Sequence, residues 1–233
     1  MTTSPGKNSH ACGCDLGHPP RFIVVTGGPG AGKTAVLEIA QRHFCEHVVV
    51  LPESASLLFR GGFPRPATRM GRRAVQRAIY RVQRELEEVA LAESGAAVVL
   101  CDRGTLDGLA YWPDEPASFF GDLDTTESAE LARYNAVIHL RTPSGENGYD
   151  HSNPLRIETA REAQVIDGHV AEAWQHHSRV IVVPTADDFM TKAARAITVI
   201  TAEVANWCGP RSVRPGGRRS TTVASPHRGA PPP

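Results

Sequence analysis

Residues 21–44 read RFIVVTGGPGAGKTAVLEIAQRHF. The run at 21–26 is short, apolar and β-branched, which predicts a buried strand, and the apolar residues after position 33 recur at helical spacing. Between them, Gly27–Thr34 matches G-x-x-x-x-G-K-[ST], a loop whose glycines let backbone N–H groups close around phosphate oxygens. The next helix directs its positive end at the same anion. This stretch therefore predicts a phosphate-binding P-loop.

The loop also predicts most of a nucleotide site. We expect Lys33 to reach the β- and γ-phosphates and the Thr34 hydroxyl to ligate Mg²⁺. ATP is the predicted nucleotide; the sequence has no N-K-x-D guanine motif, but GTP stays an alternative. The residues expected to contact the nucleotide are Gly27, Gly28, Pro29, Gly30, Ala31, Gly32, Lys33, Thr34 and Ala35.

Apolar strand-like runs and helical segments alternate along the chain. Further strands are expected at 47–51, 96–101, 134–140 and 179–183, with helices at 67–94, 155–178 and 187–206. This alternation is typical of a parallel sheet with helices on both faces. The predicted fold is a three-layer α/β P-loop NTPase with a central five-stranded parallel sheet, like nucleoside and nucleotide kinases. The helix at 67–94 is expected to carry an apolar stripe of Val75, Ile79, Val82, Leu86 and Val89.

The two ends of the chain differ from the predicted domain at 21–207. Residues 1–20 are small and polar, and residues 208–233 hold five Arg, no acidic residue and many Pro and Gly. Both ends are therefore predicted to be disordered tails. The first tail contains a Cys/His cluster, for which a structural zinc site is the minor alternative because its C-x-C spacing is unusual. The cluster consists of His10, Cys12, Cys14 and His18.

Composition limits the classes of function. The chain has 233 residues, of which 41% are apolar, and a formal net charge of +0, so it is globular and no general electrostatic binder of nucleic acid. No run approaches about 20 apolar residues and the first residues lack an apolar h-region, so neither a membrane span nor a secretory signal is expected. Five Cys without disulfide-ladder spacing favour a reducing compartment. We expect a cytoplasmic protein. Its basic residues are 22 Arg and three Lys, which makes Lys33 conspicuous.

Charged residues after two other strands are candidates for chemistry at the phosphates. Asp102 ends the third strand, as in the Walker B arrangement that holds the Mg²⁺ shell, and Asp102-Arg103 resembles the DR motif of nucleoside and thymidylate kinases. Glu53, after the second strand, is the candidate general base, with Asp102 as the competing base and Asp107 as a more distant one. The alternative for Glu53 and Asp102 is helix capping.

An Arg-bearing lid is expected after the fourth strand, where small-molecule kinases place one. Arg156 is the first candidate to neutralise the transferring phosphoryl group, followed by Arg161 and Arg141. The alternative is surface pairing with Glu158 and Glu162.

Two further sets of residues are candidates for the acceptor pocket. Tyr111 and Trp112 are expected either to line the pocket or to pack in the core. For Arg72, Arg73 and Arg77 a solvated basic face is favoured, with contact to an acceptor's phosphate as the alternative.

Five blocks of this sequence resemble the NadR/TRPL-translocation-defect-protein AAA family. In chain order they are GGPGAGKT, LPESA, CDRGTLDGLAYW, YNAVIHLRTP and GYDHSNPLRIETAREAQVIDGHVAEAW. The resemblance covers roughly 21–206 and is most specific in the DRG-x₂-D-x₂-AYW block and the N-P-x-R-x-E helix. It implies nucleoside triphosphate and Mg²⁺ binding in a ribosylnicotinamide kinase-like fold, and phosphotransfer activity. The animal branch resembles a GTP- and phosphoinositide-binding trafficking factor.

The predicted function is Mg²⁺-dependent phosphotransfer from ATP to a small hydroxylated, nucleoside-like acceptor. One alternative is a nucleotide-dependent ATPase or GTPase switch that acts through a partner, and a second is a 5′-hydroxyl polynucleotide kinase. The sequence leaves the acceptor and the oligomeric state open. The expected catalytic residues are Lys33, Glu53, Asp102, Arg103 and Arg156, and the expected metal ligands are Thr34 and Asp102.

Overall fold

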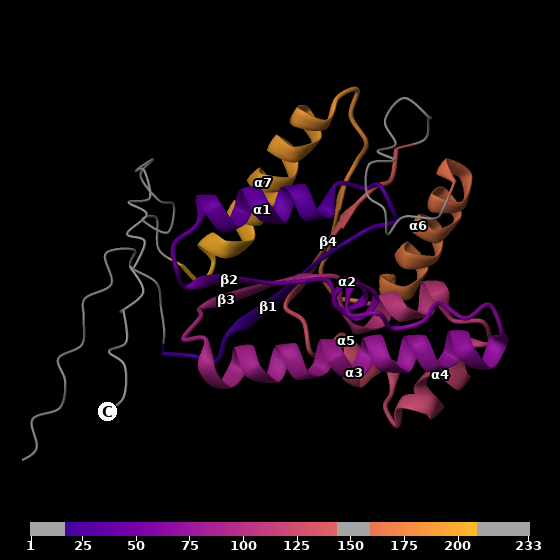
Figure 1. Ribbon diagram of the computed structural model, residues 1–233. Coiled ribbons are helices and arrows are strands. Elements are labelled where there is room, and N and C mark those ends of the chain that lie inside the picture. Colours follow the sequence, from indigo (N-terminus) through magenta and orange to yellow (C-terminus); the bar gives the residue numbers. More distant parts are fainter. Residues whose placement is uncertain (1–16, 144–158, 209–233) are drawn as a thin grey trace, which may run out of the picture.

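The computed structural model describes residues 17–143 and 159–208 (Figure 1). Arg156, His10, Cys12, Cys14 and the segment 209–233 lie outside the described residues. The sheet has the order β2-β3-β1-β4-β5, and all neighbouring strands are parallel. The predicted α/β fold with a five-stranded parallel sheet is thus confirmed. Its strands are β1 (Arg21–Thr26), β2 (Val48–Leu51), β3 (Val98–Asp102), β4 (Ala136–Leu140) and β5 (Val180–Val183).

Helices follow the strands as the alternation predicts. They are α1 (Lys33–His43), α2 (Ser54–Arg60), α3 (Arg69–Glu93), α4 (Pro116–Leu123), α5 (Glu127–Leu131), α6 (Ala160–Trp174) and α7 (Phe189–Ala205), with a 3₁₀ helix η1 (Thr105–Tyr111) after β3. The starts of α6 and α7 are set by side chains that accept backbone N–H bonds, Thr159 from Glu162 and Asp188 from Thr191. In the described part of the chain, no helix has the length and apolar character needed to cross a membrane.

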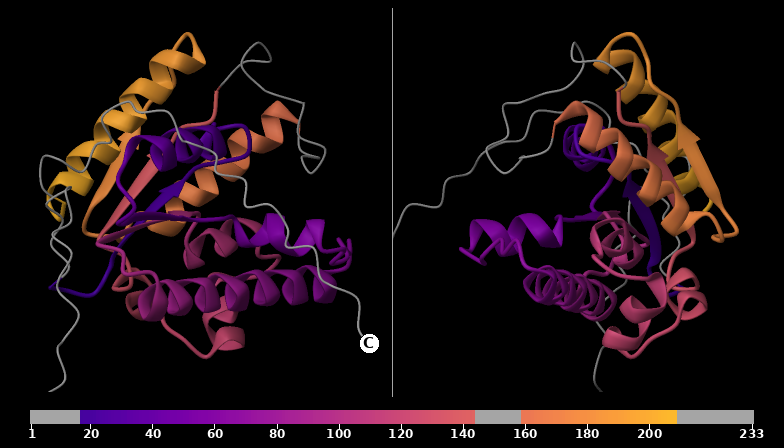
Figure 2. Two further views of the ribbon diagram at one scale, coloured as in Figure 1. Left: turned by 60° about the vertical axis from the view of Figure 1, so that its left-hand side comes forward. Right: turned by 90° about the vertical axis from the view of Figure 1, so that its right-hand side faces the viewer.

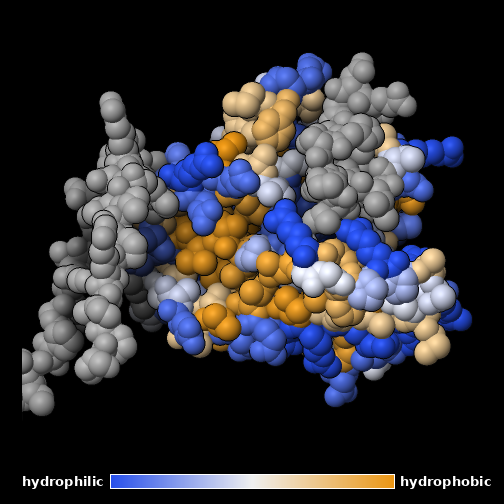
Figure 3. Space-filling view, in the orientation of Figure 1, coloured by the Kyte–Doolittle hydropathy of each residue, from blue (hydrophilic) through white to orange (hydrophobic). Residues whose placement is uncertain are grey.

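Helices cover both faces of the sheet (Figures 1 and 2). Successive β1 side chains alternate between two cores, with Ile23 facing one and Val24 the other. The first core packs α1 and α7 against the sheet, and the second packs α3, η1 and α6. Apolar side chains are also visible between α1 and α3 (Figure 3), on the side where edge strand β2 leaves Val49 and Val50 half-buried.

The buried face of α3 differs from the predicted apolar stripe. Val75 is buried, but Val89 is 55% exposed. Polar side chains take part in the buried face because they satisfy one another: Gln83 accepts a hydrogen bond from Ser54 at 2.7 Å and donates to Glu87 at 2.8 Å. The prediction that Val89 belongs to the apolar stripe is wrong, because it rested on the spacing of apolar residues alone. The buried residues of α3 are Val75, Gln76, Tyr80, Gln83, Glu87 and Ala90.

The strand register brings three loops to one edge of the sheet. Val25 pairs with Asp102 across β1 and β3, and Leu51 pairs with Cys101 across β2 and β3. Because the three strands are parallel and adjacent, the segments that leave them start side by side. This places the P-loop, the segment starting at Glu53 and the turn at Arg103 around one space.

The core between α7 and the sheet yields a stability prediction. Ile200 is fully buried there, so Ile200→Ala is expected to lower the free energy of unfolding by about 2–5 kcal/mol through lost burial and a cavity. Met190 on the same helix is 69% exposed, so Met190→Ala is the matched control, with a change within about 0.5 kcal/mol. Urea unfolding followed by circular dichroism measures both, and equal midpoints for the two variants would contradict the packing described.

Candidate active site

The P-loop connects β1 to α1 through backbone conformations that only glycine adopts easily. Gly27 and Gly32 have φ values of 136° and 89°. A Cβ atom on Gly27 would lie 2.1 Å from the Leu140 carbonyl oxygen, so no side chain fits there. α1 begins at Lys33, directly after the loop. The loop thus places N–H groups and a positive helix end around one point, which is how proteins bind phosphate.

Lys33 lies under this loop. Its side chain is buried and donates to the carbonyl oxygens of Gly27 at 2.8 Å and Gly28 at 3.0 Å. Burial, followed by the nearby Arg103 guanidinium, lowers the pKa of Lys33 from 10.5 to about 8. An anion in the loop offsets both effects, so phosphate favours the charged form of this amine.

Asp102 and Thr34 face each other across the end of the sheet. Thr34 Oγ1 lies 3.5 Å from Asp102 Oδ2, while Asp102 Oδ1 is buried without a hydrogen-bond partner among the described residues. Burial and the nearby Glu53 carboxylate raise the pKa of Asp102 to about 6. An unpartnered carboxylate oxygen beside a hydroxyl fits a hard divalent cation. Within 17–143 and 159–208 no three His, Cys, Asp or Glu are grouped to hold a metal, so such an ion would need phosphate or water oxygens as further ligands.

Glu53 and Arg103 form an ion pair next to the P-loop. Arg103 Nε donates to Glu53 Oε1 at 2.7 Å, and Arg103 Nη1 donates to the Gly27 carbonyl oxygen at 3.2 Å. Burial would raise the pKa of Glu53, but the cations Arg103 and Lys33 outweigh it and hold that pKa at about 2. Arg103 has a φ of 73°, an uncommon left-handed conformation for a residue other than glycine. The ion pair and the turn at Arg103 together place its guanidinium against the P-loop.

Asp107 completes this cluster from η1. Its Oδ1 accepts from Arg103 at 3.1 Å and from the Thr26 hydroxyl, and its Oδ2 accepts from the Gly104 N–H at 3.0 Å and from Trp174 Nε1 at 3.1 Å. Four donors satisfy a buried carboxylate, so its arrangement is that of a residue that positions Arg103. From the sequence, Asp107 is predicted only as a candidate general base more distant than Glu53 and Asp102.

Two further residues that sequence reasoning missed hold the P-loop from behind. Lys192 of α7 donates to the carbonyl oxygen of Ala31 at 2.7 Å and to that of Arg141. Asp167 of α6 accepts a hydrogen bond from the Gly28 N–H at 2.9 Å and forms an ion pair with Arg141, whose Nε lies 3.2 Å from Asp167 Oδ2. The scarcity of Lys in this chain was the available signal for Lys192; Asp167 carries no comparable signal because it sits in an ordinary amphipathic helix.

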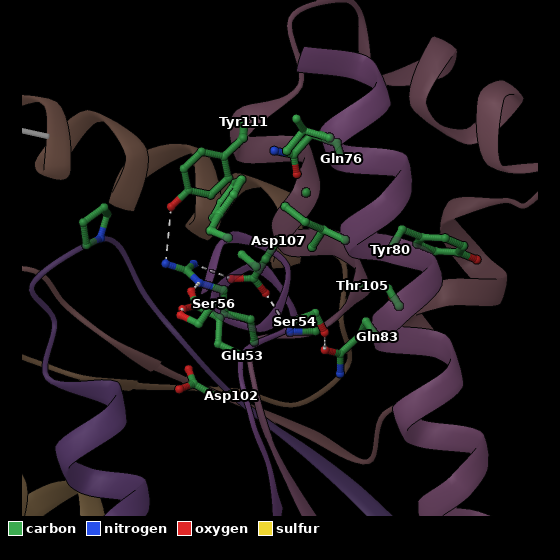
Figure 4. A pocket seen from close by; sticks show the side chains of 18 of the residues that line it. Glu53, Ser54, Ser56, Gln76, Tyr80, Gln83, Asp102, Thr105, Asp107 and Tyr111 are labelled. Atoms are coloured by element: carbon green, nitrogen blue, oxygen red, sulfur yellow. Dashed lines mark hydrogen bonds and ion pairs between the residues drawn. The ribbon is translucent and has the colours of Figure 1, made fainter. Parts of the chain in front are cut away.

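A cavity of about 460 Å³ extends from the P-loop along α3. At one end it is bounded by Lys33, Thr34 and Asp102, and then by Glu53 and Arg103. Its outer walls come from α2, α3, the segment before α3, and η1 (Figure 4). Tyr111 lines this cavity, whereas Trp112 is buried in a small cluster with Tyr80, Phe119 and Leu123.

The lid candidates separate in the structure. Arg156 lies outside the described residues. Arg161 is exposed in the first turn of α6, and Arg141 binds Asp167. Neither Arg161 nor Arg141 is among the residues that bound the described cavity.

The fold and the loop define a P-loop nucleotide-binding domain. A family model described as an AAA domain matches residues 22–189, and the chain therefore belongs to this AAA-domain family. The chain is also similar to the tRNA dimethylallyltransferase of Dinoroseobacter shibae: the match is 209 residues long with 24% identity, and it covers 82% of this chain and 67% of that protein. The AAA and P-loop part of the resemblance is thus confirmed, whereas the narrower NadR-like assignment stays a prediction.

The contacts behind the P-loop predict an effect on nucleotide affinity. Lys192→Met removes two charge-assisted hydrogen bonds to carbonyl oxygens near the loop, so we expect nucleoside triphosphate binding to weaken about tenfold, or about 1.4 kcal/mol. Arg195→Met on the exposed side of α7 is the control. Titration with a fluorescent triphosphate measures both; equal affinities in the two variants would contradict a role for Lys192 in shaping the loop.

Asp167 predicts a pH dependence of stability. Burial would raise its pKa, but the His139 and Gly28 hydrogen bonds outweigh this and lower the pKa from 3.8 to about 2 in the folded state. A depressed pKa stabilises the fold above pH 4, and this stabilisation fades as the pH falls towards 2. The stability advantage of wild type over Asp167→Asn should therefore shrink by about 1 kcal/mol between pH 5 and pH 3. Urea unfolding at both pH values tests this, and a constant difference would contradict it.

Proposed function

We propose that the chain is a kinase-like phosphotransferase that moves the terminal phosphoryl group of ATP to the hydroxyl of a small acceptor, with Mg²⁺ as cofactor. The observation that supports this most directly is the continuity of the cavity. Lys33 and Thr34 line the same cavity as Glu53 and Arg103, so the donor phosphates and the acceptor hydroxyl can meet in it. Its volume of about 460 Å³ is in the range of small-molecule sites.

Residues on the P-loop side would hold the donor. Gly27 to Ala35 would bind the phosphates through N–H groups, with Lys33 as the cation closest to them. Thr34 and Asp102 would hold Mg²⁺, since Asp102 Oδ1 lacks any other partner among the described residues. The bound ion would supply charge neutralisation on the phosphate oxygens. Arg156 of the expected lid stays the candidate for the remaining charge.

Residues on the other side would hold the acceptor. In the proposed step the acceptor hydroxyl oxygen bonds to the γ-phosphorus, the bond between that phosphorus and the bridging oxygen of ADP breaks, and the hydroxyl proton passes to the Glu53 carboxylate. Glu53 is ionised at neutral pH and would accept a hydrogen bond from the acceptor hydroxyl, although a pKa of about 2 makes it a weak base. A weak base that orients the acceptor hydroxyl is enough when the transition state of phosphoryl transfer is loose, because the hydroxyl proton is then transferred late in the reaction. Asp102 is the competing base only where it does not hold Mg²⁺, because its pKa of about 6 belongs to the metal-free site and a bound cation lowers it.

A nucleotide-dependent switch is the second candidate, favoured by one contact. Asp167 links α6 to the Gly28 N–H of the P-loop, so a shift of the loop on nucleotide binding would reach α6 and the segment before it. This candidate predicts tight nucleotide binding with little turnover until a partner is present.

Phosphate transfer from γ-labelled ATP with Mg²⁺ tests the proposal. The acceptor panel contains nucleosides, nicotinamide riboside, pantetheine-type alcohols and 5′-hydroxyl oligonucleotides. We expect label on one small acceptor, with a loss of at least about 100-fold in Lys33→Ala and Glu53→Gln, in line with the removal of electrostatic and positioning groups. Glu88→Gln, on the exposed side of α3, is the matched control and should keep wild-type activity.

The other results identify the alternatives. ATP binding that depends on Lys33, without label on any acceptor, favours the switch. Label on oligonucleotides alone favours a polynucleotide kinase. Because one relative is a tRNA dimethylallyltransferase, a parallel reaction with a dimethylallyl donor and tRNA is included, and product there would replace phosphotransfer as the function.

A further inference from the structure

The arginines in the first three turns of α3 and in the segment before it fall into two groups by their partners. Those that face α4 and the segment before it are neutralised: Arg73 pairs with Asp114 at 3.2 Å, and Arg77 pairs with Asp122 at 2.8 Å. Arg69 is also paired with Asp114. The predicted solvated basic face is therefore, at these positions, a set of ion pairs that tie α3 to its neighbour.

Arg65 and Arg72 differ from this group. The Arg65 guanidinium lies 3.8 Å from the centre of the Phe59 ring, and Arg72 Nη2 donates to the Tyr111 carbonyl oxygen at 3.3 Å. No carboxylate in the described part of the chain forms an ion pair with either one. Both line the cavity. Neutral contacts thus hold two uncompensated positive charges at this end of it.

Gln76 adds a second observation in the same cavity. Only 9% of it is exposed, and its carboxamide has no hydrogen-bond partner among the described residues (Figure 4). Gln83, two turns further along α3, uses both of its amide atoms, accepting from Ser54 and donating to Glu87. Its amide atoms are not among the buried polar atoms that lack a partner, so they are open to the cavity and can exchange hydrogen bonds with a polar group of a ligand there.

The spacing on α3 orders these groups. Arg72, Gln76 and Gln83 lie on the face of the helix that lines the cavity. Gln83 contacts Ser54, which is next to Glu53. Along the axis of α3, Gln83 therefore lies at about the position where the acceptor hydroxyl would meet Glu53. With a rise of about 1.5 Å per residue, Gln76 is about 10 Å and Arg72 about 16 Å further along the axis. A ligand that reaches from Glu53 to Arg72 is therefore elongated.

We propose that the acceptor is an anionic alcohol: its hydroxyl lies at Glu53, a planar polar group meets Gln76, and a phosphate or carboxylate binds between Arg65 and Arg72. The inference rests on the proposed function, since it names the class of acceptor for that site. Guanidinium groups suit such anions because they donate several charge-assisted hydrogen bonds in a fixed plane.

Matched pairs of probes test the anion site by binding alone. Adenosine 3′-monophosphate and adenosine share a 5′-hydroxyl, and pantothenate and panthenol share a primary hydroxyl; within each pair only the charge of the far end differs substantially. Calorimetry is run with the full chain, Mg²⁺ and a saturating non-hydrolysable ATP analogue. The variants are Arg65→Gln/Arg72→Gln, Gln76→Leu, and Arg69→Gln as the ion-paired control on the same helix.

We expect the anionic member of at least one pair to bind wild type at least tenfold more tightly. That preference should fall to about one in Arg65→Gln/Arg72→Gln and persist in Arg69→Gln, while affinity for the ATP analogue stays constant in both. Gln76→Leu should weaken both members of the bound pair alike. Preference in the first pair identifies a phosphate and in the second a carboxylate. Equal affinities within both pairs, a preference that survives the double variant, or no binding of any probe overturns the inference.

Label transfer to the same probes separates this result from the proposed function. Anion-dependent binding without label transfer to any acceptor supports the anion site and counts against phosphotransfer. Label transfer to adenosine or panthenol at the rate found for the anionic partner supports phosphotransfer and overturns the anion site.

Discussion

The buried carboxylate of Asp107 is the interaction on which the rest of the site depends. It receives donors from β1, from the turn after β3 and from α6, so three parts of the chain that are distant in sequence meet at two oxygen atoms. Removing such a charge partner leaves buried donors unsatisfied, which costs far more than a surface ion pair. Arg103 owes its place to this carboxylate and in turn aligns Glu53. The relative positions of Glu53 and Arg103 are therefore set by contacts within the protein itself.

The P-loop is held in a comparable way from its other side. α6 and α7 follow β4 and β5, which lie on the other side of β1 from β2 and Glu53 in the strand order. Asp167 and Lys192 nevertheless contact the P-loop itself. Backbone N–H and carbonyl groups that would otherwise be unsatisfied near the end of β1 are paired by these side chains. The nucleotide loop thus lies between two rigid supports. The loop is therefore held by α6 and α7 through side chains that belong to neither β1 nor α1.

Sequence reasoning reached the fold because short β-branched runs and helical periodicity recur with regular spacing, and because the P-loop fixes which strand is β1. It also singled out Glu53, Asp102 and Arg103, whose position after strands places them at one edge of a parallel sheet. It could not find Asp107 or Asp167 as positioning residues, because their roles come from donors supplied by distant elements. The exposure of Val89 was missed for the same reason: periodicity names the faces of a helix but not what packs against each.

Lysine is rare in this chain, and where the structure describes it, it is buried. Lys33 and Lys192 are 7% and 4% exposed, and they are the two lysines in the described part of the chain. Every other cationic side chain there is Arg or His, which amine-directed reagents do not acylate readily. The surface formed by these residues is therefore poor in reactive amines. The rate at which an acylating reagent modifies Lys33 and Lys192 reports how often the phosphate loop opens, with little background from the rest of the domain.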